Sequence, residues 1–178
     1  MSLPAELLKL IGSYSITTSF VVGAQGQVAN PDGGSSGIGN STDRKLLGAL
    51  RSNAEIVLTS GRTARLERYK MPRTADLAIF TNQGVQELAL SPTPPQRLIV
   101  FGQDHASSFS EAIEYIQSVG YQRIHVEFGP TGFGSCAESI EKTFLSSKER
   151  VGLEKFCKER GLSPDHQFDL GDLIVWAC

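Results

Sequence analysis

Two glycine turns are the places where this sequence is best suited to bind an anion. Gly61-Arg62-Thr63 follows an apolar run at residues 55–60, and Gly129-Pro130-Thr131-Gly132 follows another at residues 123–128. A turn between a strand and a helix offers free backbone N–H groups and the positive helix end to a phosphate. Either glycine alone could serve only the backbone geometry of a tight turn. Two such turns, each followed by a threonine, favour a nucleotide ligand.

Arg62 and Glu127 are the charged residues beside these turns. The Arg62 guanidinium can form charge-assisted hydrogen bonds to a terminal phosphate. Glu127 ends the second apolar run, where a ligand bound at the carboxyl ends of the strands lies within reach. A solvated carboxylate at a strand terminus is the alternative interpretation of Glu127, with about equal weight.

Other nucleotide and catalytic motifs are absent from the sequence. Neither G-x-G-x-x-G nor G-x-x-x-x-G-K-[ST] occurs. Residues 33–37 match G-x-S-x-G, but they lie within a long loop instead of a strand-to-helix elbow, so a hydrolase that uses Ser35 is a weak alternative. His105, His125 and His166 do not have the spacing of metal ligands, and His125 lies in an apolar strand pattern that favours a structural histidine. The sequence predicts no metal site.

Strand and helix patterns alternate along the chain. Apolar, β-branched runs predict strands at 15–23, 55–60, 76–81, 97–101 and 123–128. Helices are predicted after residue 40 up to Arg51, from residue 62, from Ser108 to Gly120, from residue 135 and over 148–160. A turn at Gly171 leads to a last strand. We therefore expect one α/β domain over residues 1–178, with a mostly parallel central sheet, helices on both faces and an antiparallel C-terminal edge.

The overall composition limits the kinds of binding partner that we expect for this protein. A net charge of −2 over 178 residues and a pI of about 5.9 give no basic stripe for nucleic acid or an anionic membrane, so a small-molecule substrate is expected. Cys136, Cys157 and Cys178 are odd in number and lack C-x-x-C spacing, which indicates reduced thiols. No export signal or membrane span is recognised, and the predicted location is the cytoplasm.

Four segments together resemble a known family. They are the glycine loop at residues 23–29 after the first strand, the helix at residues 43–51 that ends in Leu50-Arg51, residues 56–63 with the turn Gly61-Arg62-Thr63, and Val126-Glu127-Phe128-Gly129-Pro130-Thr131. The pattern resembles the pyrimidine reductases of riboflavin biosynthesis, the C-terminal reductase domain of a bifunctional deaminase-reductase with the dihydrofolate-reductase-like fold. The resemblance covers residues 16–144, and the last segment is its most specific part.

The resemblance implies NADPH-dependent reduction of a ribosylamino-pyrimidine phosphate by a homodimer. It implies substrate contacts from Ser35, Arg51, Arg73 and Glu127. Glu127 is also the implied catalytic residue, which could orient the substrate and relay a proton to it. The implied cofactor contacts are Val22, Gly37, Gly61, Thr63, Glu67 and Asn82, together with the second turn and its continuation, Gly129, Pro130, Thr131, Gly132, Phe133, Gly134 and Ser135. To these we add Arg62, as a contact to the adenosine 2′-phosphate.

The sequence also departs from the family pattern. Gln25 stands where the family has an aspartate, and Gly37 where it has an aromatic residue. The stretch after Ile140 is shorter than usual. These departures fall largely on the substrate side, so the alternative is a non-catalytic or differently specific NADP-binding relative of the same fold.

Overall fold

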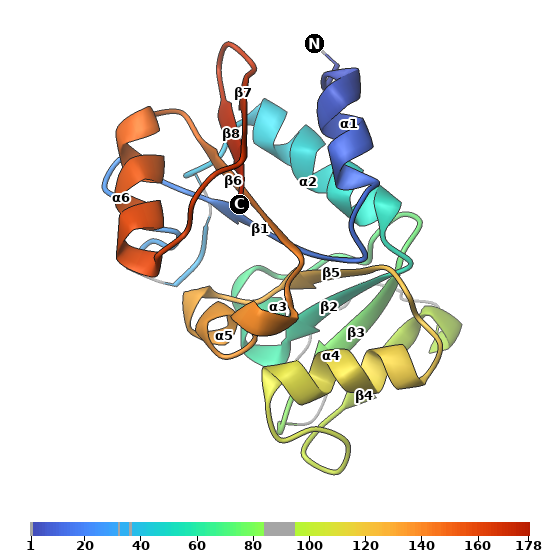
Figure 1. The fold of residues 1–178 in the computed structure, drawn as a ribbon. Coiled ribbons are helices and arrows are strands. Elements are labelled where there is room, and N and C mark those ends of the chain that lie inside the picture. The colour runs from blue at the N-terminus through green and yellow to red at the C-terminus, as the bar shows by residue number, and fades with distance from the viewer. Residues whose placement is uncertain (1, 32, 36, 84–94) are drawn as a thin grey trace.

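The computed structural model describes residues 2–31, 33–35, 37–83 and 95–178. Within these residues one eight-stranded sheet runs through the molecule in the order β4-β3-β2-β5-β1-β6-β8-β7 (Figure 1). Its strands are β1 (Ile16–Val21), β2 (Ile56–Ser60), β3 (Asp76–Phe80), β4 (Leu98–Phe101), β5 (Ile124–Glu127), β6 (Lys142–Ser147), β7 (His166–Asp169) and β8 (Ile174–Ala177).

The first six strands in this order are parallel to one another, and β8 and β7 form an antiparallel edge next to β6. Parallel strands that are covered on both faces require continuous apolar runs. β2 meets this requirement, because Ile56, Val57 and Leu58 are all fully buried. The predicted mostly parallel sheet with an antiparallel C-terminal edge is confirmed.

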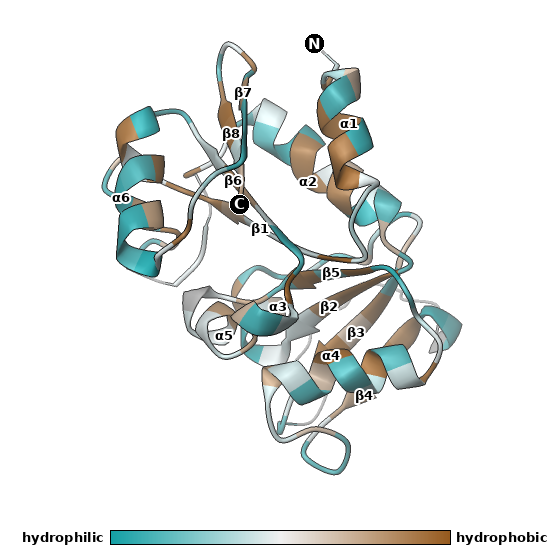
Figure 2. Ribbon diagram, viewed as in Figure 1, coloured by the Kyte–Doolittle hydropathy of each residue, from teal (hydrophilic) through white to brown (hydrophobic). Residues whose placement is uncertain are grey.

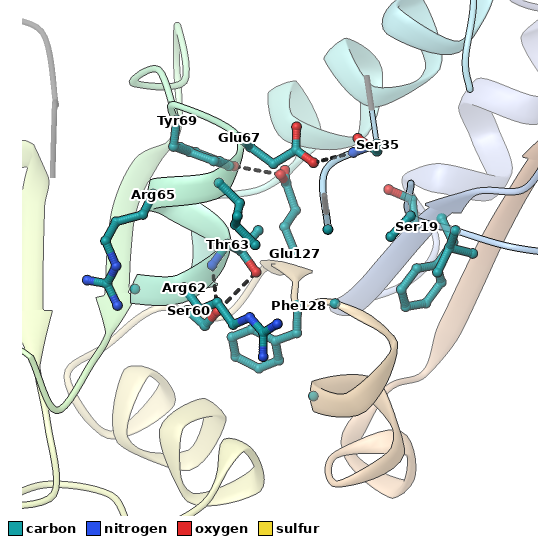
Figure 3. A pocket seen from close by; sticks show the side chains of 18 of the residues that line it. Ser19, Ser35, Ser60, Arg62, Thr63, Arg65, Glu67, Tyr69, Glu127 and Phe128 are labelled. Carbon is teal, nitrogen blue, oxygen red and sulfur yellow. Dashed lines mark hydrogen bonds between the residues drawn. The ribbon is translucent and has the colours of Figure 1, made fainter. Parts of the chain in front are cut away.

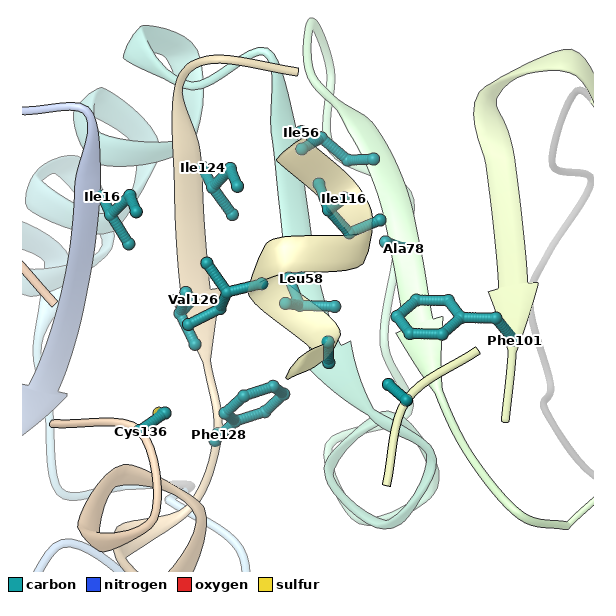
Figure 4. Packing of buried hydrophobic residues seen from close by; sticks show 13 residues of the cluster. Ile16, Ile56, Leu58, Ala78, Phe101, Ile116, Ile124, Val126, Phe128 and Cys136 are labelled. Atoms are coloured by element: carbon teal, nitrogen blue, oxygen red, sulfur yellow. The ribbon is translucent and has the colours of Figure 1, made fainter. Parts of the chain in front are cut away.

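Helices cover both faces of the sheet, as predicted. On one face, α1 (Ala5–Ile11) and α2 (Ser41–Asn53) share a core with Phe144 and Val175, and α3 (Gly61–Leu66) packs beside them on β2 and β3. The other face carries α4 (Phe109–Ser118), α5 (Pro130–Gly134) and α6 (Arg150–Arg160). Figure 2 shows hydrophobic strands between helices whose outer sides are hydrophilic. Figure 4 shows Ile116 of α4 over Ile56, Leu58, Ile124 and Val126.

Local capping fixes where the helices begin. The Asn40 side chain accepts hydrogen bonds from the backbone N–H groups of Thr42 and Asp43 at the start of α2. Ser108 caps α4 through the N–H of Glu111. The Glu111 carboxylate accepts from the N–H of Ser107, one residue before the position that a capping box requires. Both predicted helix starts are confirmed.

Three elements were not predicted: α1, β6 and β7. β6 contains Lys142, Thr143, Ser146 and Ser147, all buried, so it has no continuous apolar run. In addition, the helix expected from residue 135 begins earlier, at Pro130, and ends at Gly134 before a 3-10 turn at Ala137–Ser139. This shift places the start of α5 directly at the glycine turn.

Candidate functional site

A cavity of about 830 Å³ opens at the carboxyl ends of β1, β2, β3 and β5. Both glycine turns line it, one through Gly61 and Thr63 and the other through Gly129 and Thr131. The chain brings them together because β2 and β5 are parallel neighbours, so the turns that follow them meet at one edge of the sheet (Figure 3). The cavity therefore lies where ligands bind in open α/β sheets.

Glu127 is held in this cavity by Arg51 and Tyr69. Arg51 Nε donates to Oε1 and Nη2 to Oε2, both at 2.7 Å, and the Tyr69 hydroxyl donates to Oε2 at 2.7 Å. Arg51 Nη2 also contacts the Tyr69 hydroxyl at 2.9 Å, and its guanidinium lies 4.9 Å from the centre of the Tyr69 ring. A bidentate pair of this kind fixes both the arginine and the carboxylate in one orientation.

The electrostatics keep this cluster charged. Burial alone would raise the pKa of Glu127, but the hydrogen bonds and charge of Arg51 lower it overall. The pKa of Arg51 is raised, because the hydrogen bond and charge of Glu127 outweigh burial. Burial and the nearby carboxylate raise the pKa of Tyr69 well above its usual value. Glu127 is therefore an ionised anchor for Arg51, and the geometry lends no support to its expected role as a proton relay.

The first turn presents hydroxyl and cationic groups. Ser60 caps α3 by accepting from the Thr63 N–H at 3.1 Å, and its hydroxyl donates to Thr63 Oγ1 at 3.0 Å. The Thr63 hydroxyl hydrogen is thereby left to donate to a ligand. Positively charged side chains from α3 and the segment after it line the same part of the cavity: Arg62, Arg65, Arg68 and Lys70.

Two of these cations carry unusual features. Nη1 of Arg65 is buried without a hydrogen-bond partner in the described part of the chain. Arg68 has a φ of 45°, in the left-handed region that long side chains rarely adopt. Unpaired buried donors and strained backbone are both costly and concentrate at ligand sites. The cationic end of the cavity therefore has the character of an anion site.

The loop after β1 is tied to the end of α3. The backbone N–H of Ser35 donates to Glu67 Oε1 at 2.7 Å, and both residues line the cavity (Figure 3). Asn82, after β3, lines it as well. Val22 and Gly37 line a second, smaller cavity of about 350 Å³ on the side of β6, with Lys148 and Glu149.

Four other predicted residues, Arg73, Phe133, Gly134 and Ser135, do not line either cavity. Arg73 is exposed just before β3, at the amino end of the parallel strands, because the chain returns there after α3. Phe133 is buried and packs edge-on against Phe20, with ring centres 5.3 Å apart. Gly134 and Ser135 are exposed beyond the cavity rim. Pro130 opens α5 as its first residue.

The cavity also contains polar residues that the sequence did not single out. They are Ser19 on β1, Asp43 on α2, Tyr69 after α3 and Ser146 on β6. Ser146 donates to Asp43 at 2.5 Å, and burial raises the pKa of Asp43. Because the four lie far apart along the chain, only the fold brings them to one place. No local spacing could have identified them.

A metal-binding cluster and a membrane-spanning helix are both absent from the described part of the chain. No group of three or more His, Cys, Asp or Glu side chains in that part of the chain is arranged to hold a metal ion. None of the helices found there is long and apolar enough to cross a membrane.

Comparison with known proteins identifies the fold. No protein-family model and no curated protein sequence matches this chain. A crystal structure of a pyrimidine reductase-like protein from Corynebacterium diphtheriae is similar to it, with a TM-score of 0.65 and 16% identity over 98% of this chain and 94% of that chain. Acinetobacter baumannii RibD gives a TM-score of 0.66 with 13% identity over 93% of this chain.

A third solved structure is the deaminase/5-amino-6-(5-phosphoribosylamino)uracil reductase of Thermotoga maritima, with a TM-score of 0.63 and 13% identity over 91% of this chain. This chain spans 55% of that protein and 58% of the Acinetobacter protein, and thus little more than half of each. At such identities the likeness establishes the fold. The fold is that of the riboflavin-pathway pyrimidine reductases, dihydrofolate-reductase-like, as the four sequence segments predicted.

Proposed function

We propose that this protein is an NADPH-dependent reductase that acts on a ribosylamino-pyrimidine phosphate. The observation that carries the proposal is the cavity that both glycine turns line, with four cations from α3 and the segment after it and with the Arg51–Glu127 pair. A dinucleotide and a second, phosphorylated ligand require two regions of this kind. The shared fold with solved pyrimidine reductases supports the same reaction class.

The residues around the turns fit a phosphorylated nicotinamide cofactor. The buried, unpartnered Nη1 of Arg65 is a donor without an acceptor, as expected where a ligand supplies one. At the second turn, α5 begins without a side-chain cap, and a Cβ built on Gly129 would meet no atom within 4 Å. The open turn therefore leaves room for a bound group. The cofactor, when bound, supplies a hydride.

We assign the cofactor to the two turns and their neighbours. Its phosphates would contact Gly61, Thr63, Gly129, Pro130, Thr131 and Gly132, with Arg62 at the 2′-phosphate. Glu67 and Asn82 line the same cavity. Val22 and Gly37 would take part from the second cavity. Phe133, Gly134 and Ser135 line neither cavity, so the assignment does not extend to them.

The part of the cavity around Arg51 and Glu127 would receive the substrate. Arg51 is held there by Glu127, so its charge is fixed in place before a ligand arrives, which reduces the ordering cost of binding. Ser35 lines the cavity as well. Arg73 lies at the amino end of the strands, away from the cavity, so its expected substrate contact is not part of this assignment. In this arrangement Glu127 contributes by orienting Arg51 and the substrate.

Fluorescence titration with NADPH and NADH tests the cofactor assignment. The wild-type protein is expected to bind NADPH, and Arg62→Ala to weaken NADPH by about 1.5–3 kcal/mol while leaving NADH nearly unchanged. Arg123→Ala removes an arginine at the amino end of β5, away from the cavity, and serves as the matched control. Failure to bind NADPH at millimolar concentration refutes the proposal, and equal losses for both cofactors refute the role of Arg62.

A second candidate is a non-catalytic NADP-binding protein of the same fold. Gln25 and Gly37, in place of an aspartate and an aromatic residue, favour it. Oxidation of NADPH in the presence of 5-amino-6-(5-phosphoribosylamino)uracil separates the two candidates. Turnover supports the reductase, and binding without turnover supports the second candidate.

A further inference from the structure

His125 lies behind the cavity, fully buried in β5, and the proposed reduction does not use it. Its Nδ1 is 2.9 Å from Thr17 Oγ1, and its Nε2 is 3.3 Å from Ser19 Oγ. Glu127 Oε1 lies 3.8 Å from the same Nε2. Thr17 and Ser19 are alternate residues of β1, the strand paired with β5, so both face this histidine.

The imidazole is neutral at physiological pH, because burial lowers the pKa of His125 to about 4. A neutral imidazole has one N–H donor and one acceptor nitrogen. The carboxylate of Glu127 determines whether Nδ1 or Nε2 carries the hydrogen. A lone pair on Nε2 would face this negative charge at 3.8 Å, whereas an Nε2–H is attracted to it. The proton therefore belongs on Nε2, and Nδ1 accepts a hydrogen bond from the Thr17 hydroxyl.

This arrangement determines what Ser19 can do. Its Oγ accepts from Nε2–H, so its own hydroxyl hydrogen is left to donate. No other hydrogen bond joins the Ser19 side chain to the described part of the protein. Ser19 lines the cavity beside Glu127, at the end assigned to the substrate. The Ser19 hydroxyl is half-buried and has a hydrogen without a partner in the protein, so it can donate a hydrogen bond to an acceptor atom of a ligand.

We propose that Ser19 binds the substrate as a hydrogen-bond donor and that His125 is the positioning residue that holds it in this role. The ligand group it selects is an acceptor, a ring carbonyl oxygen or an unprotonated ring nitrogen, next to the Arg51–Glu127 pair. A ligand that offers only an amino group at this point would leave the Ser19 hydroxyl hydrogen without an acceptor. The inference rests on the proposed function, since it requires that the substrate occupies this end of the cavity.

Nuclear magnetic resonance determines directly which ring nitrogen of His125 carries the proton. Long-range ¹H–¹⁵N correlation spectra of ¹⁵N-histidine-labelled protein between pH 6 and 8 distinguish the two neutral tautomers, and the spectrum of His125→Gln identifies the signals of His125. The expected result is a neutral ring protonated at Nε2. A ring protonated at Nδ1, or a doubly protonated ring, overturns the proposal whatever the protein binds.

Calorimetric titration with 5-amino-6-(5-phosphoribosylamino)uracil tests the ligand contact. Ser19→Ala is expected to weaken binding roughly five-fold, the loss of one neutral hydrogen bond, with NADPH affinity unchanged. Thr18→Val is the matched control, because it removes the neighbouring hydroxyl, which donates to the Val126 carbonyl and does not line the cavity.

The outcomes separate the two proposals. Equal affinities of wild type and Ser19→Ala overturn the role of Ser19 and leave the proposed function standing. A wild-type protein that binds NADPH but not this pyrimidine overturns the proposed substrate, and the inference with it. If Ser19→Ala binds the pyrimidine more weakly than wild type and Thr18→Val does not, the result supports both the proposed substrate and the role of Ser19.

Discussion

Glu127 illustrates how much of a site depends on partners that are distant in sequence. The residue was predicted from its place before the second glycine turn, and Arg51 from its place at a helix end. Their pairing was not predicted, because they are 76 residues apart and meet only when α2 packs over β5. Tyr69 gave no signal at all, since its contact with Glu127 depends on how the chain returns after α3. Residue types were thus predictable, and their roles were not.

Replacing Arg51 tests this cluster. Arg51→Leu leaves a buried carboxylate with Tyr69 as its remaining partner, and we expect a loss of about 3 kcal/mol in the free energy of unfolding at pH 7. The folded pKa of Glu127 is lowered, so its contribution is present above the unfolded pKa and is lost as the pH falls through the folded pKa. The difference between wild type and variant in urea unfolding should therefore shrink in acid.

The double variant Arg51→Leu with Glu127→Gln provides the control for that experiment. Removing the charge that Arg51 neutralises should recover part of the lost stability. A double variant less stable than Arg51→Leu alone would show that Glu127 is not the residue that requires Arg51.

His125 is a second residue that should make the free energy of unfolding depend on pH. Its pKa falls from 6.5 in the unfolded chain to about 4 in the folded protein. As the pH drops below 6.5 the unfolded chain binds the proton first, so stability declines until about pH 4, by about 3 kcal/mol in total. Urea unfolding of wild type and His125→Gln at pH 7, 5.5 and 4.5 checks this. Parallel stability curves for the two proteins would contradict the assignment of a neutral, buried ring.

At the scale of elements, apolar periodicity and capping residues predicted most of the sheet and the helices that cover it. These signals failed where the buried side chains are polar. β6 contains a buried lysine and two buried serines, made tolerable by the contacts of Lys142 with Asp165 and of Ser146 with Asp43. Such compensation is tertiary, so the sequence of β6 does not show it. α1 is short and has no side-chain N-cap, which leaves its start unmarked.

Two helical glycines should respond oppositely to alanine. Gly48 lies exposed within α2, where an added Cβ meets nothing within 4 Å, so Gly48→Ala should stabilise the protein by about 0.5–1 kcal/mol. Gly152 of α6 lies against the loop after β1, where a Cβ would come within 2.2 Å of the Gly23 carbonyl oxygen, so Gly152→Ala should destabilise it. Thermal unfolding measures both, and a shift of the same sign in both variants would contradict these packing assignments.

At the scale of the whole molecule, the cavity draws on elements from β1 to β6, so a ligand there should stabilise the fold as a unit. We propose that residues 1–178 form one domain, because a single sheet connects these elements. The homodimer and the cytoplasmic location stay predictions, the first from the family resemblance and the second from the sequence, and sedimentation velocity measures the oligomeric state.

A ligand that binds only the folded protein raises its free energy of unfolding, so NADPH binding can be measured as a gain in stability. At an NADPH concentration 100 times its dissociation constant, the free energy of unfolding should rise by about 2.7 kcal/mol, with a corresponding increase in Tm. The same concentration of NADH should raise Tm less, because it lacks the 2′-phosphate. An identical Tm with and without NADPH would show that the folded protein does not bind it.

A crystal structure of the protein soaked with NADPH tests the central claim most directly. The account predicts the cofactor in the cavity at the carboxyl ends of β2 and β5, with its phosphates between Gly61-Arg62-Thr63 and Gly129-Pro130-Thr131-Gly132. It also predicts the Arg51–Glu127 pair unchanged at the substrate end. A cofactor bound elsewhere, or a cavity empty at saturating NADPH, would contradict it.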